Sequence, residues 1–149
     1  MPVSLRKGNF WQPKLRTGAA MVRLCCAQLL VDWVSFNQWG KHVGFDAEEA
    51  TPLDVTIAAD QLAADVEWAA SRLPFETKCL PRAMALSWKL RDNRIVHSVV
   101  IAVRPHQLRQ APNALHAWVE VAGRRILGDL PGPWIETARF GRQSASHGD

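Results

Sequence analysis

The stretch PFETKCLPRAMALSWKL, residues 74–90, decides how this chain folds. Its apolar residues fall on nearly all sides of a helical projection, which is typical of a helix enclosed by the rest of a domain. Pro81 can stand only in the first turn of such a helix, because a proline has no N–H to donate. We therefore predict a buried helix that begins near Cys79 and ends at about Arg91.

Two further helices are predicted before this one. Apolar residues recur every three or four positions over residues 17–39, and this helix is expected to be largely buried. The same spacing predicts a second helix from Leu53 or Thr56 to Arg72. Residues 1–16 hold two prolines and a glycine among scattered charges, which indicates an irregular arm.

After the helix that contains residues 79–91, the sequence changes from helical to strand periodicity. Runs typical of strands lie at 96–103, 115–121 and 125–127. Helices followed by strands predict an α+β fold, with N-terminal helices packed on a small antiparallel sheet. The tail after Pro133 is predicted to be frayed and polar.

The length of 149 residues fits a single domain. Within it we expect an irregular arm at 1–16, an N-terminal helical segment at 17–54, a core that carries the candidate chemistry at 55–133, and a tail at 134–149. The sequence has no internal repeat or low-complexity block that would divide it further.

The composition excludes several classes of function. The net charge of +4 and the pI near 9.3 come without a concentrated Lys/Arg stripe, so nucleic-acid binding is not expected. Arg23 and Asp32 interrupt the most apolar segment, residues 18–34, which argues against a signal peptide or a membrane span. Seven Trp and no Tyr indicate a bulky core or a groove lined with indoles, and the core is the expected place for most of them.

The cysteines indicate a reducing compartment. Cys25, Cys26 and Cys79 form an odd set without a CxxC pair, which argues against a disulfide framework and against a zinc site. We therefore expect a cytoplasmic protein with reduced thiols. The adjacent Cys25 and Cys26 lie in an apolar segment and are interpreted as small buried side chains.

Cys79 is the candidate nucleophile because of its place at the predicted helix start. Unpaired N–H groups and the positive end of the helix dipole favour a thiolate over a thiol there. The same N–H groups, notably that of Cys79, are suited to hold the oxyanion of a tetrahedral intermediate. A cysteine at the start of a buried helix is more often only a core residue, by roughly five to one, so a chemical partner is needed.

His116 supplies such a partner on the second predicted strand. In the run LHAWVEV, residues 115–121, the apolar residues at odd positions share one face, whereas His116, Trp118 and Glu120 share the other. His116 therefore does not belong to the apolar face, and we interpret it as a general base.

Asp129 is predicted to lie across from His116. If Ala122-Gly123 forms a two-residue hairpin loop, counting back along both strands pairs His116 with Asp129. Opposed residues have Cβ atoms about 4.5–5.5 Å apart, within reach of a hydrogen bond from imidazole to carboxylate. A one-residue slip would place Asp129 on the wrong face, and an aspartate in such a segment is otherwise an ordinary turn residue.

The remaining histidines and motifs add no cofactor. His97 lies among apolar strand residues and is interpreted as a hydrogen-bonded sheet histidine, and only secondarily as a reserve base. His42, His106 and His147 lie in loop-like or terminal segments. The sequence has no HExxH, GxGxxG or phosphate-loop pattern, so neither a metal nor a nucleotide cofactor is expected.

Taken together, these segments resemble a known family. The motifs Cys79-Leu80-Pro81-Arg82-Ala83 and His116-Ala117-Trp118-Val119-Glu120, followed by Asp129, are similar in type and order to the leader peptidases of lasso-peptide biosynthesis. Those enzymes are bacterial members of the transglutaminase-like, papain-related cysteine proteases. The resemblance covers residues 55–130. It implies that Cys79 is the nucleophile, His116 the general base and acid, and Asp129 the carboxylate that orients the histidine.

The resemblance also implies a substrate and partners. Peptidases of this family remove the leader from a ribosomally made precursor, and a separate cyclase then closes the freed core peptide with the use of ATP. In many such systems a small separate recognition protein delivers the leader. The implied partners are therefore the precursor peptide, the leader-recognition protein and the lasso cyclase, and the length of this chain matches the stand-alone form of the protease.

Two other functions stay open at this point. The same triad serves amine acyltransferases of the transglutaminase type, in which an amine instead of water resolves the acyl-enzyme. The chain would alternatively be a non-catalytic module whose groove binds a peptide and whose thiol is incidental.

Overall fold

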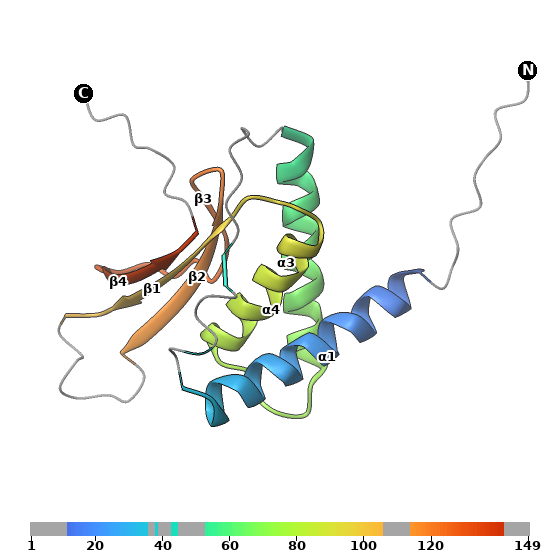
Figure 1. Ribbon diagram of the computed structural model, residues 1–149, viewed down its shortest axis with the longest axis horizontal. Coiled ribbons are helices and arrows are strands. Elements are labelled where there is room, and N and C mark those ends of the chain that lie inside the picture. Colours follow the sequence, from blue (N-terminus) through green and yellow to red (C-terminus); the bar gives the residue numbers. More distant parts are fainter. Residues whose placement is uncertain (1–11, 36–37, 39–42, 45–52, 106–113, 142–149) are drawn as a thin grey trace, which may run out of the picture.

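Helices come first along the chain and strands second. The computed structural model describes residues 12–35, 38, 43–44, 53–105 and 114–141. Its helices are α1 (Gln12–Trp33), α3 (Leu53–Arg72) and α4 (Cys79–Asp92). Its strands are β1 (Ser98–Val103), β2 (Leu115–Val121), β3 (Arg124–Leu127) and β4 (Ile135–Phe140), as labelled in Figure 1.

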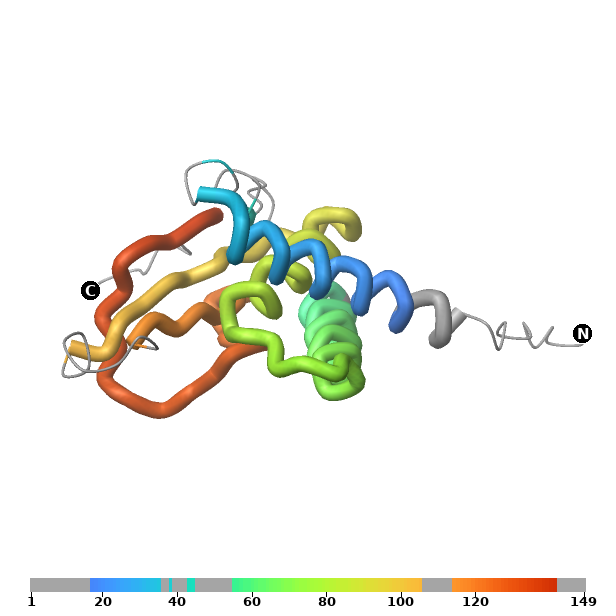
Figure 2. The backbone as a smooth tube through the Cα atoms, turned by 90° about the horizontal axis from the view of Figure 1, so that it is seen from below, coloured from blue at the N-terminus to red at the C-terminus, as the bar shows by residue number. Residues whose placement is uncertain are grey.

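The strands form one antiparallel sheet in the order β3-β2-β1-β4. The helices lie together on one side of this sheet (Figure 1), and α4 packs directly on its two central strands, β2 and β1. Seen from below, β4 forms the outer edge of the sheet beside β1 (Figure 2). This arrangement confirms the predicted α+β fold with helices before a small antiparallel sheet.

α4 is the centre of the molecule, as its sequence predicts. It contacts both other helices as well as the sheet, and its residues Ala83, Met84, Leu86 and Leu90 are fully buried. Pro81 is the third residue of the helix, where its missing N–H has no helical partner to lose. The predicted helix boundaries agree with the observed ones to within a residue.

The two faces of β2 carry different cores. Ala117, Val119 and Val121 belong to the large apolar cluster beneath the helices. Trp118, only 3% exposed, packs on the opposite face in a smaller cluster with residues of β1. The predicted alternation along this strand is confirmed, and it sets His116 on the side of the smaller cluster.

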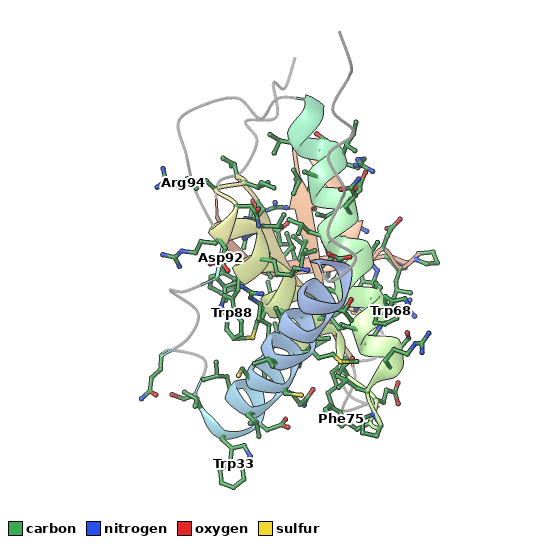
Figure 3. All side chains as sticks on the ribbon, turned by 90° about the vertical axis from the view of Figure 1, so that its right-hand side faces the viewer. Trp33, Trp68, Phe75, Trp88, Asp92 and Arg94 are labelled. Carbon is green, nitrogen blue, oxygen red and sulfur yellow. The ribbon has the colours of Figure 1, made fainter. Side chains whose placement is uncertain are left out.

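α1 differs from its prediction in length and burial. It begins at Gln12 and ends at Trp33, so the predicted irregular arm is already helical from residue 12, and the predicted span of 17–39 ends too late. Nor is the helix largely buried, because Leu29 is 59% and Trp33 85% exposed. Trp33 projects from the end of α1 away from the body of the protein (Figure 3). The helix lies on the outside of the helical layer, so that Ala20, Leu24 and Ala27 are fully buried and Met21, Leu30 and Val31 are only half-buried against the core.

β4 corrects the prediction of a frayed tail from residue 134 onward. Ile135–Phe140 pairs with β1 along its length, with an irregularity in register between Ile101 and Ala102. Two ion pairs hold this polar strand, because Arg139 contacts both Glu136 and Glu120 on β2. The core segment predicted at 55–133 therefore extends to Phe140.

Of two predictions about core composition, one holds in part and the other is wrong. Among the described tryptophans, Trp118 is buried and Trp88 and Trp134 pack half-buried against the two apolar clusters, whereas Trp33 and Trp68 are exposed. Cys26 is exposed and Cys25 half-buried, although both were expected inside. The outward position of α1 explains the exposure of Trp33 and Cys26.

His97 is a buried, hydrogen-bonded histidine, as predicted. Its Nδ1 lies 2.8 Å from the Ile95 carbonyl oxygen, which can only accept, so Nδ1 carries the hydrogen. Nε2 of the neutral ring therefore accepts a hydrogen bond from the Ser87 hydroxyl over 2.7 Å. The oxygen of that hydroxyl in turn accepts from the Gly44 N–H. The network joins α4 to the start of β1. His42, His106 and His147 lie outside the described residues.

The described helices contain no segment that is both long enough and apolar enough to cross a membrane.

Candidate active site

The first backbone N–H groups of α4 receive no capping hydrogen bond from the side chain of the N-cap residue. Cys79 is the first helical residue, and Lys78 precedes it as N-cap in an extended conformation, with φ −71° and ψ 165°. The Lys78 side chain makes no capping hydrogen bond. The N–H groups of Cys79 and Leu80 therefore point out of the helix end without a cap from that residue, next to the thiol.

Arg82 braces this helix start from one turn further on. Its Nε donates to the Thr77 hydroxyl over 2.8 Å, and its Nη1 lies 3.2 Å from a Glu67 carboxylate oxygen on α3. Thr77 is buried. Arg82 thus links the segment before α4 to the helix itself and to α3, and these contacts fix the position of Cys79.

A single pocket brings the sequence-predicted site residues together. The start of α4 meets the start of β2, where Cys79 Sγ lies 3.9 Å from the Leu115 carbonyl oxygen. A pocket of about 400 Å³ opens beside this contact, and Cys79, His116 and Asp129 all line it. Its other lining residues are Glu67, Glu76, Thr77, Lys78, Arg82, Ala117, Leu127, Gly128 and Leu130.

His116 is held by a backbone carbonyl. It is 7% exposed, and its Nε2 lies 2.6 Å from the carbonyl oxygen of Gly128. A carbonyl can only accept a hydrogen bond, so Nε2 carries the hydrogen and Nδ1 of the neutral ring keeps its lone pair. The ring is therefore set as a base at Nδ1.

Gly128 is fitted closely to β2. Its φ of +79° favours glycine, and a Cβ placed on it would lie 2.6 Å from the Ala117 carbonyl oxygen and 3.2 Å from Trp118 Cα. No other residue type brings its own carbonyl this near to the histidine strand without displacing the chain. The carbonyl that accepts from His116 thus depends on the absence of a side chain.

Asp129 does not contact His116, which corrects the predicted pairing. The two-residue loop is as predicted, since Val121 pairs with Arg124 and both loop residues have positive φ. A bulge at Ile126 of β3, between the pairs of Glu120 and Val119, then shifts the register so that Val119 pairs with Leu127. Asp129 is displaced by one position, its side chain is 75% exposed, and its carboxylate lies 3.5 Å from Arg125. Its catalytic role stays a prediction.

The structure brings Cys79 and His116 to one pocket without a direct hydrogen bond between them. Catalytic hydrogen bonds are commonly long in unliganded enzymes and shorten when substrate binds, so the geometry is compatible with a nucleophile and its base. Sequence reasoning missed the Gly128 carbonyl, because a backbone acceptor leaves no trace in residue type. The only signal was the glycine itself, next to the expected carboxylate.

The pocket offers no evident place for a metal ion. Among the residues that the structure describes, no group of three or more His, Cys, Asp and Glu side chains is gathered closely enough to bind one. Its charged side chains are instead mixed in sign, with Lys78 and Arg82 beside Glu67, Glu76 and Asp129.

Comparison with known proteins identifies the family. No curated protein and no solved structure matched the chain. A family model described as the transglutaminase-like superfamily matches residues 28–141, a range that includes every strand of the sheet and all three candidate site residues. The chain therefore belongs to the transglutaminase-like superfamily.

Proposed function

We propose that this protein is a cysteine peptidase that removes the leader from a ribosomally made lasso-peptide precursor. The observation that carries the proposal is the shared pocket, in which a thiol at an uncapped helix start lies near a histidine whose Nδ1 is free to act as a base. Membership of a superfamily that includes cysteine proteases and acyltransferases supports this chemistry. The motifs around Cys79 and His116 support the leader peptidase in particular.

In the proposed mechanism, His116 Nδ1 takes the proton from Cys79 Sγ. The thiolate attacks the carbonyl carbon of the last leader residue, and a C–S bond forms as the carbonyl oxygen becomes an oxyanion. The uncapped N–H of Cys79 donates to that oxyanion. Collapse of the intermediate breaks the C–N bond, and His116 protonates the departing amine of the core peptide.

Hydrolysis completes the cycle. His116 takes a proton from a water molecule, whose oxygen attacks the thioester carbon. The C–S bond then breaks, the leader leaves as a free acid, and the proton held by His116 returns to Cys79. Through both steps the Gly128 carbonyl keeps Nε2–H in place, and Asp129 contributes a negative charge at the pocket edge that stabilises the imidazolium.

The surroundings of the pocket suit a peptide. The carbonyl oxygen of Leu115, whose side chain is exposed, lies beside the thiol, and the exposed side chain of Leu130 lines the pocket. Phe75, which is also exposed, directly precedes the lining residue Glu76. Exposed apolar side chains around a polar site are typical of a surface that binds a polypeptide. We expect the precursor leader to lie there, delivered in the cytoplasm by a separate leader-recognition protein and followed by the lasso cyclase.

The test is cleavage of a lasso precursor that carries its leader, incubated with this chain and the recognition protein encoded with it, and followed by mass spectrometry. We expect free leader acid and core peptide from the wild type and from Cys26→Ala, an exposed cysteine outside the pocket, and neither product from Cys79→Ala. Full processing by Cys79→Ala would refute the assignment.

The same experiment separates the two alternatives. An added small amine that ends up as a leader amide would indicate an acyltransferase, because the amine then replaces water. Binding of the precursor without any product, equally in the wild type and in Cys79→Ala, would indicate a peptide-binding module.

A further inference from the structure

The connection from β3 to β4, residues 128–134, holds the His116 ring from two directions. This connection forms the wide turn between the two strands in Figure 2. Its first residue, Gly128, accepts from Nε2 over 2.6 Å. Its last residue, Trp134, stacks on the imidazole with ring centroids 5.0 Å apart and an interplanar angle of 30°. One loop therefore sets both the tautomer of the ring and the position of its face.

Arg104, just beyond the end of β1, fastens the far end of this loop. Its guanidinium carbon lies 4.6 Å from the centre of the Trp134 ring, and its Nη2 donates to the Pro131 carbonyl oxygen over 2.9 Å. Its backbone N–H donates to Ala114, which precedes β2. A cation over an indole and a hydrogen bond to the same loop fix the indole where it meets His116.

The loop is built closely around this contact. The Trp134 indole N–H donates to the Leu130 carbonyl oxygen over 3.0 Å, which closes the loop on itself. A Cβ on Gly132 would lie 3.1 Å from Arg104 Nη2. Within the described part of the chain, the buried Nε of Arg104 has no hydrogen-bond partner, so the guanidinium is placed by the indole and by Pro131 rather than by an acceptor at Nε.

We propose that Trp134 and Arg104 are positioning residues for the general base. Arg104 holds Trp134, and Trp134 keeps the imidazole in the one orientation that donates Nε2–H to Gly128 and leaves Nδ1 free. The kinetic consequence rests on the proposed function, whereas the consequence for the tautomer of His116 does not. Both residues act through His116 and touch neither the thiol nor the reacting bond.

The matched control is a second arginine–tryptophan pair. Arg72 lies over Trp68 on α3 at the same 4.6 Å, outside the pocket. The test compares Trp134→Leu and Arg104→Met with Trp68→Leu and Arg72→Met. Trp134→Phe, which keeps an aromatic face, serves as the conservative variant, and circular dichroism checks that each variant is folded.

The first readout is the tautomer of His116, taken from ¹⁵N spectra of the imidazole in a Cys79→Ala background at about pH 9, where free imidazole is neutral. We expect a single Nε2–H tautomer in the parent, in both controls and in Trp134→Phe. Trp134→Leu and Arg104→Met should show averaging of the two tautomers. A retained Nε2–H tautomer in both of these folded variants would overturn the proposal, whether or not the protein is a peptidase.

The second readout is precursor cleavage in the wild-type background. Loss of orientation should lower kcat by about 10- to 100-fold in Trp134→Leu, with KM within about 3-fold of the wild type, and Trp134→Phe should recover most of the rate. Arg104→Met should fall in the same direction. Equal kcat in these variants and in their α3 controls would overturn the kinetic part. If Trp134→Leu fails to fold, Arg104→Met decides both readouts.

Discussion

Replacement of Gly128 by alanine tests the central feature of the site, the carbonyl that holds His116. The new Cβ would lie 2.6 Å from the Ala117 carbonyl oxygen, and an ordinary contact needs 3.4 Å, so the loop must move from β2 by about 0.8 Å. Because His116 is itself on β2, the same movement lengthens its 2.6 Å hydrogen bond to about 3.4 Å, beyond the usual limit for N–H···O.

The expected effect follows from this displacement. A shift of about 1 Å in a catalytic group costs on the order of 100-fold in rate, so Gly128→Ala should lower kcat by about that factor. The fold should lose about 2–4 kcal/mol of unfolding free energy, of which about 1 kcal/mol is backbone strain at positive φ and the rest is steric overlap.

Gly123→Ala is the matched control. Gly123 has nearly the same φ, +74° against +79°, but nothing lies within 4 Å of its hypothetical Cβ. It should lose only the strain of about 1 kcal/mol and keep its activity within about 2-fold of the wild type. The comparison therefore separates loss of the carbonyl position from strain of the backbone.

Two assays measure the outcome. The first is precursor cleavage, and the second, which needs no substrate, is the rate of iodoacetamide alkylation at Cys79. The latter requires Cys25→Ala and Cys26→Ala in the background, because Cys26 is exposed. Urea unfolding confirms that both glycine variants are folded. Equal cleavage and alkylation rates in Gly128→Ala and Gly123→Ala would refute the role assigned to the Gly128 carbonyl.

Two further predictions concern acidic residues. Asp129→Asn should lower kcat/KM by less than about 10-fold in the cleavage assay, because the Gly128 carbonyl already fixes the tautomer of His116. A loss of about 10⁴-fold would mean that the Asp129 carboxylate reaches the imidazole during the reaction. Hydrogen bonding to Arg139 lowers the pKa of Glu136 from its usual 4.5, so the stabilisation from this pair is present at neutral pH and is lost as pH falls through the lowered pKa. Glu136→Gln should therefore lower Tm at pH 7, by an amount equivalent to about 0.2–1 kcal/mol of unfolding free energy for this partly exposed pair. Thermal unfolding at pH 3 should show a smaller difference in Tm between this variant and the wild type. An equal difference at both pH values would contradict the linkage between the pKa of Glu136 and stability.

The sequence was sufficient for the parts of the fold that depend on local pattern. The proline in the first turn and the continuous apolar surface after it located α4, and the strand alternation separated His116 from the core face of β2. The Ala122-Gly123 loop predicted the first two pairs of the hairpin. In each case the signal lies within a few residues, where backbone chemistry decides the outcome.

Errors arose where distant contacts override local pattern. A bulge at Ile126 changed the register, and nothing in the loop length indicates an extra residue on one strand. β4 is absent from the predicted strands because its polar residues are typical of a tail, whereas in the fold Arg139 pairs with Glu120 on β2 as well as with Glu136. The prolines and the glycine of residues 1–16 predict an irregular arm, but Pro13 falls in the first turn of α1, where a proline is tolerated.

Because the acceptor for His116 is the main-chain carbonyl of Gly128, grafting this site onto another protein requires more than its side chains. Every residue type carries a carbonyl, so position 128 contributes space and a backbone angle rather than a functional group. A design that grafts Cys79, His116 and Asp129 onto another α+β scaffold would copy the side chains and omit the element that sets the base. The smallest transferable unit is the helix start together with β2 and the whole connection from the bulge at Ile126 to Trp134.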